Sequence, residues 1–238
     1  MERERYDDLT LILPTLNEVD TAPLIIKSAI RRFPGISITV VDDGSRDGTV
    51  DAVKKVSRHN GSIAIIRRDR KGLPKGLTAS IIDGIAASRT RYVAVMDADM
   101  QHPIGKLYDV ERWLSDGYQL VVCSRSSVRG WPLDRKIISK LLSSLGYLVL
   151  IVRGKKRCAD IFSGYFGIDK KAVYGIIAKN RGRFVDNGYK FLFDLLKCID
   201  SGGEVKIRDV PYEFGNRKFG ASKAGAVQVV ALLRAFLT

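Results

Sequence analysis

The chain has 238 residues, of which 45% are hydrophobic, and its mean hydropathy is −0.03; this composition excludes a disordered protein and favours one large domain. Forty basic residues against 26 acidic ones give a net charge of +14, which predicts an anionic partner such as a phosphorylated substrate or a phospholipid surface. The three cysteines show no CxxC spacing, which argues against a zinc site or a disulfide framework and fits a reducing compartment.

Short apolar runs alternate with helical patterns over the first 125 residues. The runs are rich in β-branched residues and are bounded by turn residues, as strands covered on both faces should be. Strands are predicted at 9–13, 36–41, 62–66, 92–96 and 120–124, and helices at 20–33, 49–60, 74–88 and 104–116. Asp47 or Thr49 is the expected cap of the second helix. This alternation predicts an α/β fold with a mainly parallel, doubly wound sheet.

The pattern changes after residue 125. We expect a mobile basic loop over 124–136, an apolar helix over 137–152, and then, in order, a strand at 162–168, a helix at 187–199, a strand at 204–214 and a tail helix at 224–237. Internal repeats, low-complexity segments and linkers are absent from the sequence. We therefore expect one domain over 1–238, with a nucleotide-sugar half at about 9–125 and an acceptor and membrane-proximal half at about 126–238.

The apolar segment 137–152 is shorter than the roughly 18 to 20 apolar residues that span a bilayer, and Lys140 interrupts it. Two interpretations stay open. The segment is either a core helix or an interfacial helix that lies on a membrane. In the second case the basic residues that follow would face anionic head groups, namely Arg153, Lys155, Lys156 and Arg157.

Polar clusters follow three of the predicted strands, at 14–18, 42–49 and 97–102. The carboxyl ends of parallel strands meet at one edge of a sheet, where ligands of such folds bind. If 97–101 is extended, Asp97, Asp99 and Gln101 point the same way and present oxygen ligands suited to Mg²⁺ or Mn²⁺. His102 either joins these ligands or closes the turn.

Four motifs in this order carry a family resemblance: "LPTLNE", "VVDDGSRDGT", "MDADMQHP" and "FGNRKFGASK". Together they resemble inverting family 2 glycosyltransferases with the GT-A fold (Rossmann-like nucleotide-diphospho-sugar transferases). Within that family the pattern is most similar to dolichyl-phosphate, or polyprenyl-phosphate, mannose synthases. The resemblance extends from about residue 9 to 225.

The resemblance implies a role for each matching position. It implies a metal site at Asp99 and Gln101, with Asp97 as a further candidate ligand, and catalytic roles for Asp99, Arg125 and Arg217. Leu16 stands where the family often has an aromatic residue that stacks on the base, and Val41 and Asp43 match positions that face the base. Arg125 matches an arginine on a loop over the site. The positions implied to lie at phosphates are Lys190, Arg217 and Lys223. The implied nucleotide-sugar-binding residues are Pro14, Leu16, Glu18, Val41, Asp43, Asp97, Ala98, Asp99, Arg125, Lys190, Arg217 and Lys223.

The acceptor implied by the resemblance is a lipid phosphate. Family 2 enzymes that glycosylate a hydroxyl usually carry a carboxylate base and a Q-x-x-R-W motif, and neither an "ED" pair nor that motif occurs here. A phosphate monoester has a second pKa near 6 and is already a nucleophile at neutral pH. We therefore expect metal-dependent transfer of a hexose, with mannose from GDP-mannose preferred, to dolichyl or polyprenyl phosphate.

The expected location is peripheral, on the cytoplasmic face of a membrane, because the N-terminus "MERERYDDLT" is charged and lacks the apolar core of a signal peptide. Relatives often continue into transmembrane helices. The chain is thus either a short form recruited by its surface helix or by a membrane-anchoring partner subunit, or it has been cut after its tail helix.

Three alternatives differ in donor, acceptor or class. The donor could be UDP-glucose or UDP-GlcNAc, and the acceptor a polysaccharide or a protein. A nucleic-acid-binding protein would also suit the charge of +14, but three acidic clusters at one edge would repel a phosphate backbone. We therefore expect no nucleic-acid partner.

Overall fold

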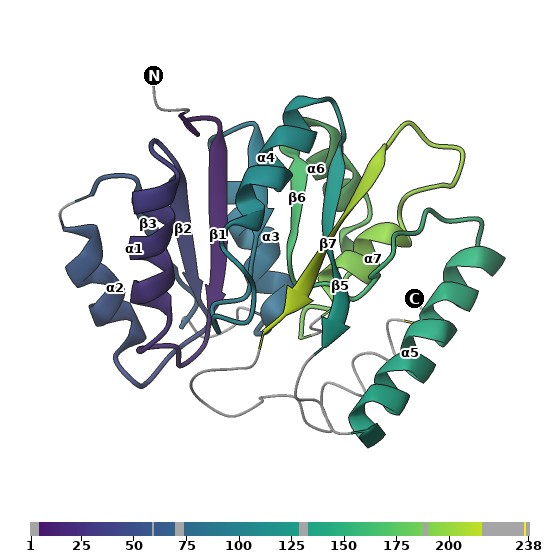
Figure 1. The fold of residues 1–238 in the computed structure, drawn as a ribbon, viewed down its shortest axis with the longest axis horizontal. Helices are drawn as coiled ribbons and strands as arrows, with labels where there is room; N and C mark the ends of the chain where they lie inside the picture. Colours follow the sequence, from purple (N-terminus) through teal and green to yellow (C-terminus); the bar gives the residue numbers. More distant parts are fainter. Residues whose placement is uncertain are drawn as a thin grey trace.

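A computed structural model describes residues 5–58, 60–69, 74–128, 133–187 and 190–215, together with residue 236. The described strands form one sheet in the order β3-β2-β1-β4-β6-β5-β7 (Figure 1). Their bounds are β1 Leu9–Thr15, β2 Ser37–Asp42, β3 Ile63–Arg67, β4 Tyr92–Val95, β5 Leu120–Val128, β6 Phe166–Asp169 and β7 Ile207–Phe214. The helices are α1 Ala22–Arg32, α2 Thr49–Ser57, α3 Leu77–Ala87, α4 Lys106–Ser115, α5 Leu133–Val152, α6 Lys170–Lys179 and α7 Phe191–Leu196.

The sheet is mostly parallel, as the sequence predicts. Strands β3, β2, β1 and β4 pair in parallel, and so do β5 and β7. Among the described strands, β6 alone is antiparallel to its neighbours, and it lies between β4 and β5. As a result β4 and β5 do not adjoin, although they follow one another in the chain with only α4 between them.

Helices cover both faces of the sheet, and alternate side chains of each strand reach opposite apolar clusters. In β1, Ile12 joins the cluster formed with α3, α6 and α7, whereas Leu11 and Leu13 join the cluster formed with α1 and α4. Figure 1 shows α1 and α4 in front of the sheet and α3 behind it. This burial on both faces explains why the strands are continuously apolar in the sequence.

Several predicted bounds were wrong in the second half of the chain. The expected loop 124–136 instead contains the end of β5, up to Val128, and the start of α5 at Leu133. The predicted strand at 162–168 is β6 at Phe166–Asp169, and the predicted helix at 187–199 is the shorter α7. The tail helix lies outside the described residues, except for Phe236, whose ring packs 5.4 Å from that of Phe193.

Helix α6 was missed, although its cap is visible in the sequence. The Asp169 carboxylate accepts the backbone N–H of Lys171 at 3.0 Å, as an N-cap residue should. The second helix begins at Thr49, as predicted, but its N-cap is Gly48, so the prediction of Asp47 or Thr49 as the cap was wrong. The Asp47 carboxylate still accepts the backbone N–H of Thr49 at 3.0 Å. Among the described residues, no helix combines the length and the apolarity needed to cross a membrane.

Candidate functional site

The polar clusters of the first half meet at the carboxyl edge of the sheet. Thr15 at the end of β1 pairs with Asp42 at the end of β2, and β4 ends beside the middle of β1, where Val95 pairs with Ile12. The three loops that follow these strands therefore begin close to one another along the same edge of the sheet. Ligands of open α/β sheets bind at such an edge, as predicted for the three polar clusters.

The first two loops are joined by hydrogen bonds. The backbone N–H of Asn17 donates to Ser45 Oγ at 2.8 Å, and Asn17 Oδ1 accepts the N–H of Arg46 at 2.9 Å. The N–H of Glu18 donates to Thr49 Oγ1 at 2.8 Å. The predicted nucleotide-contacting stretch is thus held against the Asp-Gly loop. Within it Pro14 is buried in β1, while Leu16 is 39% exposed at the edge.

Asp42 shapes the second loop. Its Oδ1 accepts the backbone N–H groups of Gly44 and Ser45, and its Oδ2 accepts Thr15 Oγ1 at 3.1 Å. The Val41 side chain is fully buried in the apolar cluster beneath the edge, so the predicted contact with a base could involve its backbone but not an exposed side chain.

Asp43, which was predicted to face the base, is held by a buried arginine that the sequence analysis missed. Arg68 Nη1 donates to Asp43 Oδ1 at 2.7 Å, and the N–H of Gly76 donates to Asp43 Oδ2 at 2.8 Å. Burial raises the pKa of Asp43 and outweighs these two donors. The Arg68 side chain is 2% exposed and also bonds Asp83 at 2.7 Å. Its position directly after β3, at the same edge as Asp43, was the available clue.

The segment after β4 is a tight turn, so the predicted extended geometry was wrong. Met100 has a φ of +62°, and Asp99 Oδ1 accepts the backbone N–H of Gln101 at 3.1 Å. The Asp97 side chain is 35% exposed, whereas Asp99 is 6% exposed as a residue, and Ala98 is buried. Alternation along a strand therefore does not place these oxygens on one face, because the segment turns at Met100.

The turn has the ligand types that Mg²⁺ or Mn²⁺ takes. It offers two carboxylates, and Gln101 adds an amide whose nitrogen donates to Gly215 O at 3.0 Å, which leaves the carbonyl oxygen for a cation. Across the described part of the chain, no group of three or more His, Cys, Asp or Glu side chains is placed to hold a metal. The residues fit a cation with few protein ligands, whose remaining positions a diphosphate would fill.

Arg125 lies within β5, not on a loop over the site as predicted. Its guanidinium forms a bidentate pair with Asp160, with Nε–Oδ2 at 2.6 Å and Nη2–Oδ1 at 2.8 Å. Burial would raise the pKa of Asp160, but the hydrogen bonds and charge of Arg125, together with the charge of Lys190, hold that pKa below its usual range. The negative charge of Asp97 also helps to raise the pKa of Arg125. The structure thus brings these groups near the turn after β4.

Lys190 lies at the start of α7, with its ammonium group 4.9 Å from the ring centre of Phe162 and 3.5 Å from the carbonyl oxygen of that residue. Its electrostatic effect on Asp160 places it beside the Arg125 pair. The two other predicted phosphate-binding residues, Arg217 and Lys223, lie outside the described residues.

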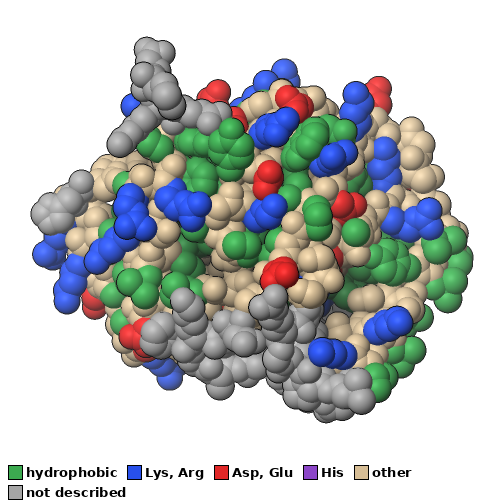
Figure 2. Space-filling model, viewed as in Figure 1, with side chains coloured by type: hydrophobic (Ala, Val, Ile, Leu, Met, Phe, Trp, Pro, Cys, Tyr) green, Lys and Arg blue, Asp and Glu red, His purple; other side chains and the backbone are tan. Residues whose placement is uncertain are grey.

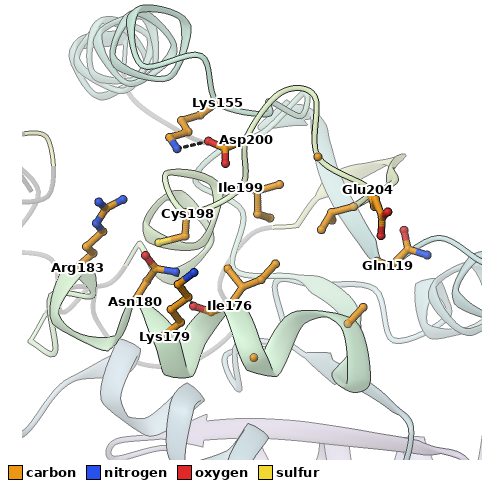
Figure 3. Close-up of a pocket in the computed structure, with 14 residues that line it drawn as sticks. Gln119, Lys155, Ile176, Lys179, Asn180, Arg183, Cys198, Ile199, Asp200 and Glu204 are labelled. Atoms are coloured by element: carbon orange, nitrogen blue, oxygen red, sulfur yellow. Dashed lines mark hydrogen bonds and ion pairs between the residues drawn. The ribbon is translucent and has the colours of Figure 1, made fainter.

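A pocket elsewhere in the molecule holds none of the predicted site residues. It is lined by α6, by the segment 198–205 and by Lys155, which forms an ion pair with Asp200 (Figure 3). Lys179 and Asn180 extend into it from the end of α6. Gln119, just before β5, also lines it, so the pocket lies at the amino edge of the sheet, opposite the turn after β4.

A family model described as glycosyl transferase family 2 matches residues 10–176, which run from β1 into α6. The chain belongs to glycosyltransferase family 2. The predicted family is thereby confirmed, and the matched span contains the three loops at the carboxyl edge.

Three similar proteins are named dolichol-phosphate mannosyltransferase. The protein of Pyrococcus furiosus is 30% identical over 95% of this chain, and that of Mycosarcoma maydis is 31% identical over 90%. The protein of Saccharomyces cerevisiae is 27% identical over 95% of this chain. The chain spans 62%, 72% and 85% of the lengths of these three proteins, respectively.

The solved structures of two phosphoglycerate-dependent sugar synthases share the fold. One is glucosyl-3-phosphoglycerate synthase from Mycobacterium tuberculosis in complex with Mn²⁺, UDP-glucose and phosphoglyceric acid. It aligns with a TM-score of 0.65 at 19% identity, and the alignment covers 96% of this chain and 79% of the synthase chain. The other is mannosyl-3-phosphoglycerate synthase from Rubrobacter xylanophilus, which aligns with a TM-score of 0.62 at 20% identity. That alignment covers 96% of this chain and 72% of the Rubrobacter chain. The predicted GT-A fold is confirmed.

Proposed function

We propose that this family 2 glycosyltransferase moves a hexose, with mannose from GDP-mannose as the preferred donor, onto dolichyl or polyprenyl phosphate at a membrane surface. The observation that carries the proposal is the similarity to three dolichol-phosphate mannosyltransferases over 90% or more of the chain. The turn of Asp97 and Asp99 at the carboxyl edge of the sheet supports it with suitable chemistry.

Asp99 and Gln101, with Asp97 beside them, would hold a divalent cation. Bound Mg²⁺ or Mn²⁺ would neutralise charge that grows on the diphosphate leaving group. The oxygen ligands of the turn support this assignment, and so does the Mn²⁺ named in the complex of the mycobacterial synthase.

Cationic side chains would complete the neutralisation. Arg125 and Lys190 lie on the side of the turn where Asp160 is buried, and Arg217 and Lys223 are proposed to bind phosphate from the segment that follows β7. Preorganised cations aimed at developing charge are worth several kcal/mol in a site shielded from water. The pairing with Asp160 fixes the Arg125 guanidinium in one orientation, which serves this preorganisation.

The transfer itself would be a single in-line displacement with inversion. An oxygen of the lipid phosphate forms a bond to the anomeric carbon while the bond from that carbon to the diphosphate oxygen breaks, and the nucleoside diphosphate leaves with the electron pair. The acceptor oxygen carries no proton to remove at neutral pH. The chain therefore needs no general base for this step.

Helix α5 would dock on the membrane. One side of it is strongly exposed and apolar, and Figure 2 shows apolar side chains along the margin where Figure 1 places α5. The exposed residues are Ile137, Ile138, Leu141, Leu145, Leu148, Ile151 and Val152. Of the basic residues that follow, Arg153 and Arg157 are exposed and would meet anionic head groups. Lys155 instead pairs with Asp200, and Lys156 donates to the carbonyl oxygen of Val205 at 2.6 Å. A peripheral position on the cytoplasmic face is proposed on this basis, with a membrane-anchoring subunit as the alternative occupant of α5.

A UDP-sugar is the second candidate donor, because the mycobacterial synthase with this fold was solved with UDP-glucose. The nucleotide base is chosen by a few contacts at the loops after β1 and β2, where Leu16 replaces the expected aromatic residue. A change of donor alters neither the fold nor the displacement.

The deciding experiment supplies Mn²⁺, radiolabelled GDP-mannose and a short polyprenyl phosphate, and follows label into the organic phase. UDP-glucose is run in parallel, and EDTA is the control for metal dependence. Transfer from GDP-mannose that EDTA stops is the expected result. Transfer only from UDP-glucose would replace the donor. Transfer to a polysaccharide or protein, but not to the lipid phosphate, would overturn the proposed acceptor.

A further inference from the structure

A buried histidine connects the turn after β4 to strand β7. The His102 side chain is 2% exposed, and its Nε2 lies 3.2 Å from Asp97 Oδ2. Its Nδ1 lies 2.7 Å from the hydroxyl oxygen of Tyr212, which is 110 residues further along the chain. Both ring nitrogens thus have protein partners, and neither of the two roles predicted from the sequence describes this residue fully.

The partners determine where the protons lie. A carboxylate only accepts hydrogen bonds, so the proton of the neutral imidazole belongs on Nε2, and Nδ1 then accepts the Tyr212 hydroxyl. The rings of Tyr165, Tyr212 and Phe214 surround the imidazole with centroids 5.3 to 5.7 Å away. The imidazole is therefore held in one plane and one tautomer.

The other side of the Asp97 carboxylate is closed by a glycine. A Cβ atom at Gly164 would lie 2.4 Å from Asp97 Oδ2 and 3.0 Å from Oδ1, so the carboxylate fills the space that a side chain would need. Between Gly164 and His102 the carboxylate has little freedom to rotate. An ordinary surface aspartate has no such enclosure, although the Asp97 side chain is still 35% exposed and can meet a ligand.

The same end of β7 also contacts Gln101. The N–H of Gly215 donates to Gln101 O at 3.0 Å, and Gln101 Nε2 donates to Gly215 O at 3.0 Å. Two candidate metal ligands, Asp97 and Gln101, are therefore oriented by β7 and by Gly215 directly after it. Groups that orient ligands in this way commonly change metal affinity about 10- to 100-fold when they are removed.

We propose that Tyr212 and His102 are positioning residues, which hold the Asp97 carboxylate in the orientation that a divalent cation at the donor diphosphate requires. The inference rests on the proposed function, because it presupposes a metal-dependent nucleotide site at this turn. It goes further by assigning a role to β7: this strand, together with Gly215 at its end, holds the proposed metal-binding turn in place.

The test uses the full chain and measures nucleotide binding, not turnover. GDP and UDP are each titrated by calorimetry over a series of Mn²⁺ concentrations, and the nucleotide that the wild type binds more tightly is used throughout. Tyr212→Phe keeps the ring and removes only the hydroxyl. We expect it to raise the Mn²⁺ concentration for half-maximal nucleotide binding about 10-fold. Tyr174→Phe, the same change at a residue on α6 that is 37% exposed, should leave it unchanged.

A second pair of variants tests the histidine. His102→Gln can still present an amide N–H near the position of Nε2, and His102→Leu cannot. We expect His102→Gln to retain a lower Mn²⁺ requirement than His102→Leu. A folding defect alone would shift thermal unfolding in both without this difference.

The outcomes separate the two proposals. Suppose that the wild type binds nucleotide with Mn²⁺, and that Tyr212→Phe needs a Mn²⁺ concentration within twofold of the wild-type value for half-maximal binding. The contact would then be merely structural, and the positioning role would be overturned while the proposed function stays intact. If the wild type binds neither nucleotide with Mn²⁺, the proposed function fails and this inference fails with it.

Discussion

Asp97 and Asp99 differ in their surroundings, although only Ala98 separates them. Asp99 is nearly buried and accepts the N–H of Gln101, which stabilises the turn, whereas Asp97 is more exposed and lies between His102 and Gly164. The two carboxylates differ in this way because the backbone turns at Met100, whose φ is +62°, and does not continue as a strand.

The first prediction at this scale concerns Asp99. Asp99→Ala should lower turnover at least 100-fold, the usual loss when one electrostatic contact to a transition state is removed. Metal-dependent nucleotide binding should weaken in parallel, while the circular dichroism spectrum stays that of the wild type. Asp51→Ala is the control, because that side chain is 79% exposed on α2. Near-normal turnover of Asp99→Ala would contradict the metal assignment.

A second prediction follows from the buried pair of Arg125 and Asp160. Asp160→Asn should destabilise the fold by about 3 kcal/mol at pH 7, since it leaves the guanidinium without its counter-charge. The pKa of Asp160 is lower in the folded state than the unfolded value of about 3.9, so the carboxylate contributes stability above that value. This contribution is lost as the pH falls through the folded pKa.

Urea unfolding at a series of pH values checks this sign. The difference in unfolding free energy between the wild type and Asp160→Asn should be constant near neutral pH and shrink below about pH 4. A difference that persists unchanged at pH 3 would mean that the charge of Asp160 is not its cause.

At the scale of single elements, α5 is the unusual helix. Helices α1 and α4 bury one side against the sheet, whereas α5 has apolar residues on an exposed side and contributes Leu150 to the core on the other. Such a helix is costly in water unless a second surface covers it. The two interpretations left open by the sequence, a core helix and an interfacial one, therefore each describe one side of α5.

A double variant tests the exposed side of α5. Leu141 and Leu148 are 68% and 55% exposed, and changing both to Glu should weaken binding to vesicles of anionic phospholipid roughly 30-fold, the equivalent of about 2 kcal/mol of lost apolar burial. Thermal unfolding should change little. Vesicle co-sedimentation measures the first quantity and differential scanning fluorimetry the second.

The matched control for α5 lies on the opposite side of the fold. Leu24 on α1 and Tyr108 on α4 are 46% and 47% exposed, and changing both to Glu alters the net charge equally. If this control lost vesicle binding as strongly as the α5 variant, general charge and not the helix would explain the binding.

At the scale of the whole molecule, the two halves share one sheet. Strand β6 comes from the second half and pairs with β4 and β5 from the first, and β5 pairs otherwise with β7. A boundary near residue 125 therefore does not separate two folding units. Within the described residues, β5 has no strand partner from the first half of the chain.

This arrangement predicts that the first half does not fold alone. A fragment of residues 1–128 should show no cooperative thermal transition, because β4 and β5 would each leave unpaired backbone groups at an edge. The full chain under the same conditions should unfold in one transition, with equal calorimetric and van't Hoff enthalpies. A cooperative transition in the fragment would show that the nucleotide-sugar half is an independent domain.

Much of this protein could be predicted from local patterns. The five strands of the first half and the four helices between them were expected within a few residues of their observed bounds, because burial on both faces requires continuous apolar runs. The polar clusters that follow three of these strands then predicted which edge holds the site. The order of the residues along the chain was sufficient for these conclusions, since each depends on neighbours only a few positions apart.

Only the tertiary structure decided which side chains meet. Asp43 pairs with Arg68, Arg125 with Asp160, and His102 with Tyr212, across 25, 35 and 110 residues. Nothing local in the sequence identifies such partners, because they meet only once the strand order is established, including the insertion of β6 between β4 and β5. The sequence by itself determined the chemistry available at the carboxyl edge; the fold determined its geometry, because burial of charged groups is stable only where distant strands supply their counterparts.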